Sequence, residues 1–88
     1  MTKVLTVYRK HPCVKCDMTI RYGKQLGYEV VVEELFDDNG KLNTVPKFYH
    51  DTYNFTVSPI VTLSEDGVLV DKWCDFQILK LNEYAPQK

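Results

Sequence analysis

The chain has 88 residues, of which 44% are hydrophobic and 26% charged, and its formal net charge is −1. This length and composition exclude a second core and a disordered chain, and the near-neutral charge argues against a nucleic-acid partner. No apolar run approaches the roughly 20 residues of a membrane span. The N-terminus is too short and too polar for a signal peptide. We therefore expect one domain over residues 1–88, located in the cytoplasm and away from membranes.

The first half of the chain predicts two strands with a helix between them. Residues 3–8 read KVLTVY, an alternation of β-branched and aromatic residues that is typical of a buried strand. Residues 9–12 end in proline and predict a turn. A helical period begins at Cys13, and Gly27 is placed to end the helix in a left-handed conformation. Residues 28–34, YEVVVEE, predict the second strand.

The second half predicts a short helix, a hairpin and a last helix. Within residues 41–53 we expect a helix opened by Thr44 as its N-cap. Residues 58–63 begin with Ser-Pro and predict a strand, because proline is tolerated at a strand's first residue. A turn containing Asp-Gly leads to a return strand over residues 68–73. Asp75 is expected to open the last helix.

The order of these elements is β-α-β-α-β-β-α. Two strands joined by a helix should be parallel with a right-handed crossover, and the two strands of the hairpin should be antiparallel. The sequence therefore predicts an α/β fold with a four-stranded mixed sheet, flanked on both faces by three helices.

The motif Cys13-Val14-Lys15-Cys16 stands directly after a strand and at the start of a helix. Free N–H groups and the helix dipole stabilise a thiolate there, so such thiols have a pKa below the free value of about 8.5. Lys10 and Lys15 add positive charge. Since the thiolate is the nucleophile of thiol–disulfide exchange, we predict that Cys13 attacks a substrate disulfide. Cys16 lies one turn along on the same side and is the predicted resolving cysteine.

The same cysteines allow a second interpretation. His11, Cys13, Cys16 and Cys74 could supply four zinc ligands, but structural zinc sites usually present two paired knuckles and this chain has one pair. A metal-binding or iron–sulfur-binding adaptor therefore stays as the alternative. Cys74, the odd cysteine, is interpreted as a small, partly buried residue. Trp73 is left open between a core residue and part of a binding surface.

Three segments together resemble a known family. The Cys-x-x-Cys motif after the first strand, Ser58-Pro59 before the third, and Trp73 to Phe76 after the fourth resemble the small glutaredoxin-like redoxins of the thioredoxin superfamily. The resemblance covers nearly the whole chain and is closest to the NrdH-redoxins, although their Trp-Ser-Gly-Phe motif is altered here at Cys74 and Asp75. Such proteins have the thioredoxin fold and act as dithiol–disulfide oxidoreductases.

The resemblance also implies partners and a reductant. NrdH-redoxins donate electrons to a class Ib ribonucleotide reductase. They are reduced by NADPH through thioredoxin reductase and hold no bound cofactor. We therefore expect ribonucleotide reductase as the target, and a monomeric protein.

The resemblance implies a binding site around the dithiol. Ser58-Pro59 would be a cis peptide that turns the backbone of Ser58 outward to pair with a substrate strand. The expected substrate-binding residues are Lys10, Pro12, Val14, Lys15, Val57, Ser58, Pro59, Trp73, Cys74 and Asp75.

A glutathione-dependent glutaredoxin is the alternative within this superfamily. Glutaredoxins bind glutathione with a lysine before the first cysteine, an aromatic residue inside the motif, a Thr-Val-Pro segment and a glycine-containing turn. Lys10 and Asp75 match this pattern, whereas Lys15 replaces the aromatic residue and both glycines are absent. Viral glutaredoxins that serve ribonucleotide reductase have similarly mixed motifs, and a phage origin is consistent with the resemblance.

Overall fold

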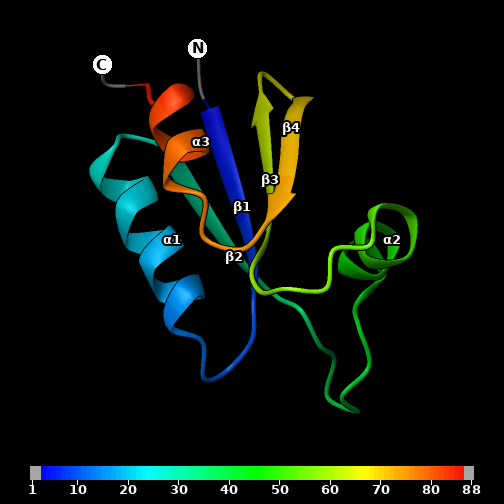
Figure 1. The fold of residues 1–88 in the computed structure, drawn as a ribbon. Helices are drawn as coiled ribbons and strands as arrows, with labels where there is room; N and C mark the ends of the chain where they lie inside the picture. Colours follow the sequence, from blue (N-terminus) through cyan, green and yellow to red (C-terminus); the bar gives the residue numbers. More distant parts are fainter. Residues whose placement is uncertain (1–2, 87–88) are drawn as a thin grey trace.

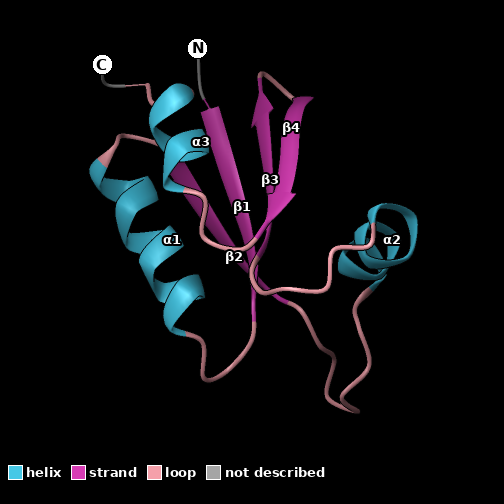
Figure 2. Ribbon diagram, viewed as in Figure 1, coloured by secondary structure: helices cyan, strands magenta, loops and turns pink. Residues whose placement is uncertain are grey.

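The computed structural model describes residues 3–86, which form a four-stranded sheet and three helices (Figures 1 and 2). The strands are β1 (Lys3–Arg9), β2 (Glu29–Glu34), β3 (Ile60–Glu65) and β4 (Val68–Cys74). The helices are α1 (Val14–Gln25), α2 (Thr44–Tyr53) and α3 (Ile78–Glu83). The predicted order of elements is confirmed.

The strands lie in the order β2-β1-β3-β4. β1 pairs in parallel with β2, so that Val7 lies opposite Val32, and antiparallel with β3, so that Val7 also lies opposite Val61. β3 and β4 are antiparallel, with an irregularity of register next to Leu63. The sheet is therefore mixed, as predicted. Because β1 is an inner strand, the chain that leads to Cys13 leaves from the middle of the sheet.

The two faces of the sheet carry different helices. Figure 1 shows α1 and α3 side by side on one face, and α2 on the other side of the molecule. Period-two alternation along β1 directs Leu5 and Val7, both fully buried, toward α1. Between them, Thr6 faces the opposite way. The main core is therefore enclosed between the sheet and the α1–α3 pair, and its buried members are Leu5, Val7, Tyr28, Val61, Leu63, Trp73 and Leu81.

Gly23 is a point of close approach between α1 and the sheet. A Cβ atom at this position would lie 2.8 Å from Cδ2 of Leu5 and 3.1 Å from Cγ2 of Val30. Only a glycine allows this close approach without displacing a side chain of the sheet. The helix that carries Cys13 and Cys16 is therefore held directly against β1 and β2.

The bounds of the first two helices differ from the prediction by one residue. Cys13 is the N-cap of α1 rather than its first helical residue, and Gly27, with φ 93°, ends the helix in the expected left-handed conformation. In α2, the N-cap is Asn43 and not Thr44. The Asn43 side chain makes no capping hydrogen bond and instead donates to the carbonyl oxygen of Glu34 at 2.9 Å.

The last helix begins later than predicted. Asp75 does not open it, because its φ of 72° lies in the left-handed region, and α3 starts at Ile78 after the N-cap Gln77. A left-handed residue cannot belong to a right-handed helix. This correction places Asp75 in the turn between β4 and α3.

Among residues 3–86, no helix has the length and apolar character needed to cross a membrane.

Tyr28 links the start of β2 to α3. Its ring is only 5% exposed, and its hydroxyl donates to the carbonyl oxygen of Leu81 at 2.6 Å. Burial, with a smaller contribution from Tyr84, raises the pKa of Tyr28 to about 12. The neutral phenol of Tyr28 therefore makes its full contribution to the stability of the fold below the pKa of the unfolded state, about 10. This contribution is lost as the pH rises through the pKa of the folded state, about 12.

Removing the Tyr28 hydroxyl tests whether its ionisation makes the stability of the fold depend on pH. We expect Tyr28→Phe to lower the free energy of unfolding by about 1 kcal/mol at pH 7, through loss of one buried hydrogen bond. The difference from the unmodified protein should shrink as the pH rises from 10 to 12. Urea unfolding of both proteins at several pH values measures this. A difference that stays constant up to pH 12 would contradict the role of Tyr28.

Candidate functional site

Cys13 and Cys16 form a disulfide, and their Cα atoms are 5.3 Å apart. Cys13 has an extended backbone, with φ −156° and ψ 103°, and Cys16 lies within the first turn of α1. Cys13 is partly exposed, whereas Cys16 is fully buried. A reagent from solvent therefore reaches Cys13 and not Cys16.

The N-terminus of α1 surrounds the Cys13 sulfur with positive potential. The backbone N–H of Cys16 donates to Sγ of Cys13 at 3.1 Å, and the carbonyl oxygen of Cys13 accepts the first intrahelical bond from Asp17. The same N–H and the helix dipole would stabilise a thiolate on Cys13 once the disulfide is reduced. The site is therefore built for a sulfur that carries negative charge.

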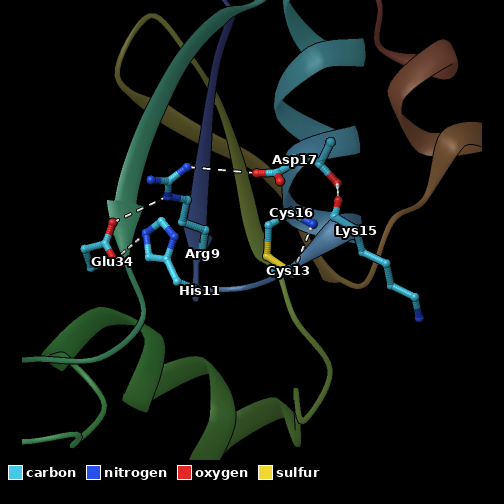
Figure 3. A network of polar contacts seen from close by, with 8 residues as sticks. Arg9, His11, Cys13, Lys15, Cys16, Asp17 and Glu34 are labelled. Atoms are coloured by element: carbon cyan, nitrogen blue, oxygen red, sulfur yellow. Dashed lines mark hydrogen bonds and ion pairs between the residues drawn. A yellow bond between two sulfur atoms is a disulfide. The ribbon is translucent and has the colours of Figure 1, made fainter.

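A cluster of charged side chains positions the loop before Cys13 (Figure 3). Nε of Arg9 lies 3.5 Å from Oε2 of Glu34, and Nη1 of Arg9 lies 4.0 Å from Oδ1 of Asp17. Nε2 of His11 lies 3.5 Å from Oε1 of Glu34. These pairs are partly exposed and each contributes little stability, but together they connect the ends of β1 and β2 to the first turn of α1. Sequence reasoning missed this cluster, because its residues come from three separate elements.

An open groove of about 360 Å³ lies beside Cys13. It is lined by the predicted nucleophile Cys13, by five of the expected substrate-binding residues, and by Thr56, which was not predicted. The lining residues are Lys10, Cys13, Val14, Lys15, Thr56, Val57 and Ser58. Val14 is 75% exposed, so the apolar surface next to Cys13 is open to solvent. The position of Thr56, two residues before Ser58 in the same loop, was the only signal for it.

An ion pair joins α1 to the turn after β4. Nζ of Lys15 lies 2.9 Å from Oδ1 of Asp75, and the same oxygen accepts a 2.7 Å hydrogen bond from the backbone N–H of Phe76. The hydrogen bond from Lys15, followed by that from Phe76, holds the pKa of Asp75 below its usual range. Asp75 is therefore ionised at neutral pH, and its Oδ1 atom receives both contacts. Figure 3 shows the Lys15 side chain directed away from Arg9 and Glu34.

The structure does not bring every expected residue to the groove. The Ser58-Pro59 peptide is cis, as the resemblance implies, but the side chain of Pro59 is fully buried. Its carbonyl oxygen accepts a hydrogen bond from the N–H of Asp75 at 2.9 Å. Pro12 is exposed in the loop before Cys13 but does not line the groove.

Trp73 and Cys74 are also placed differently from the expected binding surface. Trp73 is only 4% exposed and belongs to the main core, so of the two alternatives left open for it the structure shows the core residue. The reason is alternation along β4, which pairs Trp73 with the buried Val61 and turns its ring toward the core. Cys74 points to the opposite face, where it packs against the smaller cluster that contains Tyr49 and Ile60.

The metal interpretation required four ligands at one place. Within the described part of the chain, no three His, Cys, Asp or Glu side chains come together in a way that could hold a metal ion. Cys13 and Cys16 are bonded to each other, and Cys74 packs in the smaller cluster. The set of His11, Cys13, Cys16 and Cys74 is therefore not assembled.

Comparison with known proteins identifies the architecture. No protein-family model matches the chain, and no curated protein sequence is significantly similar to it. Among solved structures, the glutaredoxin-like protein NrdH-redoxin from Escherichia coli, described as having a thioredoxin-like activity profile, superimposes with a TM-score of 0.64 at 22% identity, covering 97% of this chain and 99% of that one.

Two thioredoxins are also similar. Mitochondrial thioredoxin 3 from Saccharomyces cerevisiae has a TM-score of 0.61 at 18% identity, covering 94% of this chain and 76% of that one. Fasciola hepatica thioredoxin has a TM-score of 0.61 at 16% identity, covering 99% of this chain and 82% of that one. The chain therefore has the thioredoxin fold, and its Cys-x-x-Cys disulfide stands at the N-terminus of the first helix.

Proposed function

We propose that the protein is a dithiol–disulfide oxidoreductase that works through Cys13 and Cys16. The observation that carries this proposal is the disulfide at the N-terminus of α1, with one sulfur accessible and the other buried. A structural disulfide needs no access from solvent. A disulfide that is oxidised and reduced in turn needs one reachable sulfur, and a groove of about 360 Å³ leads to Cys13.

The reaction has two displacements. In the reduced protein, the Cys13 thiolate attacks one sulfur of the target disulfide, and the other sulfur leaves as a thiolate. The Cys16 thiolate then attacks Sγ of Cys13, releases the second target thiol and forms the Cys13–Cys16 disulfide. Two electrons pass to the target, and the buried position of Cys16 protects it from competing reagents.

The proposed reductant is thioredoxin reductase with NADPH, rather than glutathione. Asp75 is the acidic residue that the glutaredoxin pattern would use for glutathione, and its carboxylate is held by Lys15 at 2.9 Å. The positive charge of Lys15 beside this carboxylate would oppose the approach of a ligand's ammonium group. The similarity to NrdH-redoxin, with its thioredoxin-like activity profile, supports the same choice.

The proposed target is ribonucleotide reductase, and the proposed compartment is the cytoplasm. Both rest on the resemblance of the sequence motifs to NrdH-redoxins. We propose a monomer that needs no bound cofactor, because the two cysteines alone carry the electrons.

The test is NADPH oxidation with a small disulfide substrate in two parallel assays. One contains thioredoxin reductase, and the other contains glutathione and glutathione reductase. Turnover in the first assay alone supports the proposal. Turnover in the second alone would make the protein a glutathione-dependent glutaredoxin that uses Lys10 and Asp75. No turnover in either assay would overturn the redox function. Addition of class Ib ribonucleotide reductase to the productive assay, with deoxyribonucleotide formation as the readout, tests the target.

The Lys15–Asp75 ion pair leads to a prediction about the choice of reductant. Lys15→Ala frees the Asp75 carboxylate, and we expect the rate with glutathione to rise by up to about fivefold relative to the rate with thioredoxin reductase, as for loss of one exposed ion pair. Lys24→Ala, at the other end of α1, removes the same charge outside the groove and should leave the ratio unchanged. An equal ratio in both variants would show that Lys15 does not select the reductant.

A further inference from the structure

The outer edge of β2 has no neighbour in the sheet. β2 is the end strand of the order β2-β1-β3-β4, and its register with β1 runs without a shift from Glu29 to Glu34. Within residues 3–86, no backbone group from outside the sheet bonds to residues 29–33, and the Asn43 side chain occupies only the carbonyl oxygen of Glu34. The N–H and C=O groups along this edge are therefore available to pair with another extended chain.

The opposite edge of the sheet, β4, is less suited to pairing. Its register with β3 is irregular next to Leu63. An irregularity of this kind bends and twists a strand, and it is one way in which an edge is kept from pairing with other chains. β2 is therefore the edge that can accept a further strand.

A groove of about 560 Å³ lies along β2, on the face of the sheet away from α1 and α3 (Figure 1). The start of α2 forms its other wall with Val45 and Pro46. Val31 is 36% exposed and Val45 is 45% exposed, so the two walls present apolar surface to solvent. An apolar side chain placed between them would be removed from water. This groove shares no lining residue with the groove beside Cys13.

The same face of β2 is acidic at both ends. Alternation places Glu29, Val31 and Glu33 on one face, so that a valine stands between two carboxylates. Both glutamates are exposed, and neither forms an ion pair with any residue in the range 3–86. Burial, followed by the charge of Glu33, raises the pKa of Tyr8, which lies opposite Glu33 in β1. A strand added to β2 would therefore meet negative, apolar and negative side chains in that order.

We propose that this edge docks an extended segment of a partner protein in which two basic side chains flank an apolar one. The segment adds to β2 as a new edge strand through backbone hydrogen bonds. Its basic groups lie beside Glu29 and Glu33, and its apolar side chain enters the groove between Val31 and Val45. The site goes beyond the proposed redox function, because a segment docked here leaves Cys13 open.

The charges argue against a second copy of this chain as the occupant. Antiparallel pairing of β2 with itself would set the glutamates at one end of the strand against those at the other end, and parallel pairing would set each glutamate beside its counterpart. Like charges directly opposite one another destabilise a pair of strands. The acidic edge therefore selects a basic partner.

The probe for this site is a fluorescein-labelled peptide with the sequence Lys-Thr-Val-Thr-Lys between glycines. It presents its lysines and its valine on one face in either strand direction. Fluorescence anisotropy at low ionic strength measures its binding. We expect it to bind at least about ten times more tightly than the Glu-Thr-Val-Thr-Glu peptide. It should also bind about five times more tightly than Lys-Lys-Val-Thr-Thr, which has the same composition without the alternation. Equal binding of the two lysine peptides would contradict strand addition.

Variants of β2 connect this preference to the edge. Glu29→Lys combined with Glu33→Lys should reverse the preference, so that the glutamate peptide binds more tightly. The milder pair Glu29→Gln and Glu33→Gln should bring the ratio of the two affinities to within about threefold of one. The matched control is Glu83→Lys, which makes the same charge change at an exposed residue of α3 and should keep the preference of the unmodified protein.

The docking site and the redox function are measured separately and can fail separately. A preference for the lysine peptide that survives both pairs of substitutions would overturn the docking site, as would no binding of this peptide up to about 1 mM. Disulfide reduction by the variants of Glu29 and Glu33 should equal that of the unmodified protein, and its absence from the unmodified protein would overturn the redox function alone. A dimer in sedimentation equilibrium that the lysine substitutions dissociate would make a second copy the occupant and overturn the proposed partner.

Discussion

Cys13→Ser should lower disulfide reduction by at least about a thousandfold, because it removes the nucleophile on which the whole reaction depends. Serine keeps the size of the side chain and its place at the N-cap of α1, where serine is a favoured residue. The fold should therefore be retained. The measurement is NADPH oxidation with the productive reductase and a small disulfide.

Cys16→Ser should behave differently, because it keeps the nucleophile and removes the resolving thiol. We expect Cys13 to attack and then remain bonded to the target, so that a mixed disulfide accumulates and is visible by mass spectrometry. Cys74→Ser is the matched control, since Cys74 packs in the smaller cluster on the other face of the sheet. If Cys13→Ser retained turnover, or if Cys16→Ser released product at the normal rate, the two assigned roles would be wrong.

The second large effect concerns the core that holds α1 in place. Leu5 is fully buried in β1, where it lies opposite Val30 and Leu63 and would be the first side chain to meet a Cβ at Gly23. Leu5→Ala leaves a cavity between the sheet and α1. We expect a loss of about 2–5 kcal/mol in the free energy of unfolding, which in a domain of this size lowers the melting temperature by 10 °C or more.

The same substitution at an exposed leucine provides the control. Leu79 is 80% exposed on α3, and Leu79→Ala should change the free energy of unfolding by less than about 0.5 kcal/mol. Thermal and urea unfolding of both variants measure the contrast. Equal effects from Leu5→Ala and Leu79→Ala would show that the core is not centred on the contact between β1 and α1.

Local patterns predicted the elements well, because each has its own periodicity and its own end signals. The alternation in residues 3–8 and the Asp-Gly turn are visible without any tertiary information. The start of the last helix was predicted too early, because the local sequence around Asp75 fits both a helix-opening residue and a residue of the preceding turn. Asp75 resembles a helix-opening residue, but its carboxylate binds Lys15, and its backbone adopts a φ of 72°.

The burial of Trp73 could likewise not be predicted from its local sequence. Tryptophan next to a motif fits either a core or a binding surface, and only the register with Val61 shows that its ring is buried. The position in the strand, rather than the residue type, determines which face of the sheet a side chain occupies.

By itself, the sequence determined the order of the elements and placed Cys13 and Cys16 side by side at the start of a helix, because these depend on residues close together in the chain. The mixed character of the sheet followed from general rules for the connections between strands. The antiparallel pairing of β1 with β3 was visible only in the tertiary structure. Only the tertiary structure decided the surroundings of the two cysteines. It brought Lys15 to Asp75 and placed the segment before Ser58 beside Cys13. The physical reason is that these contacts join residues far apart in sequence, and such contacts are set by how helices and strands pack together.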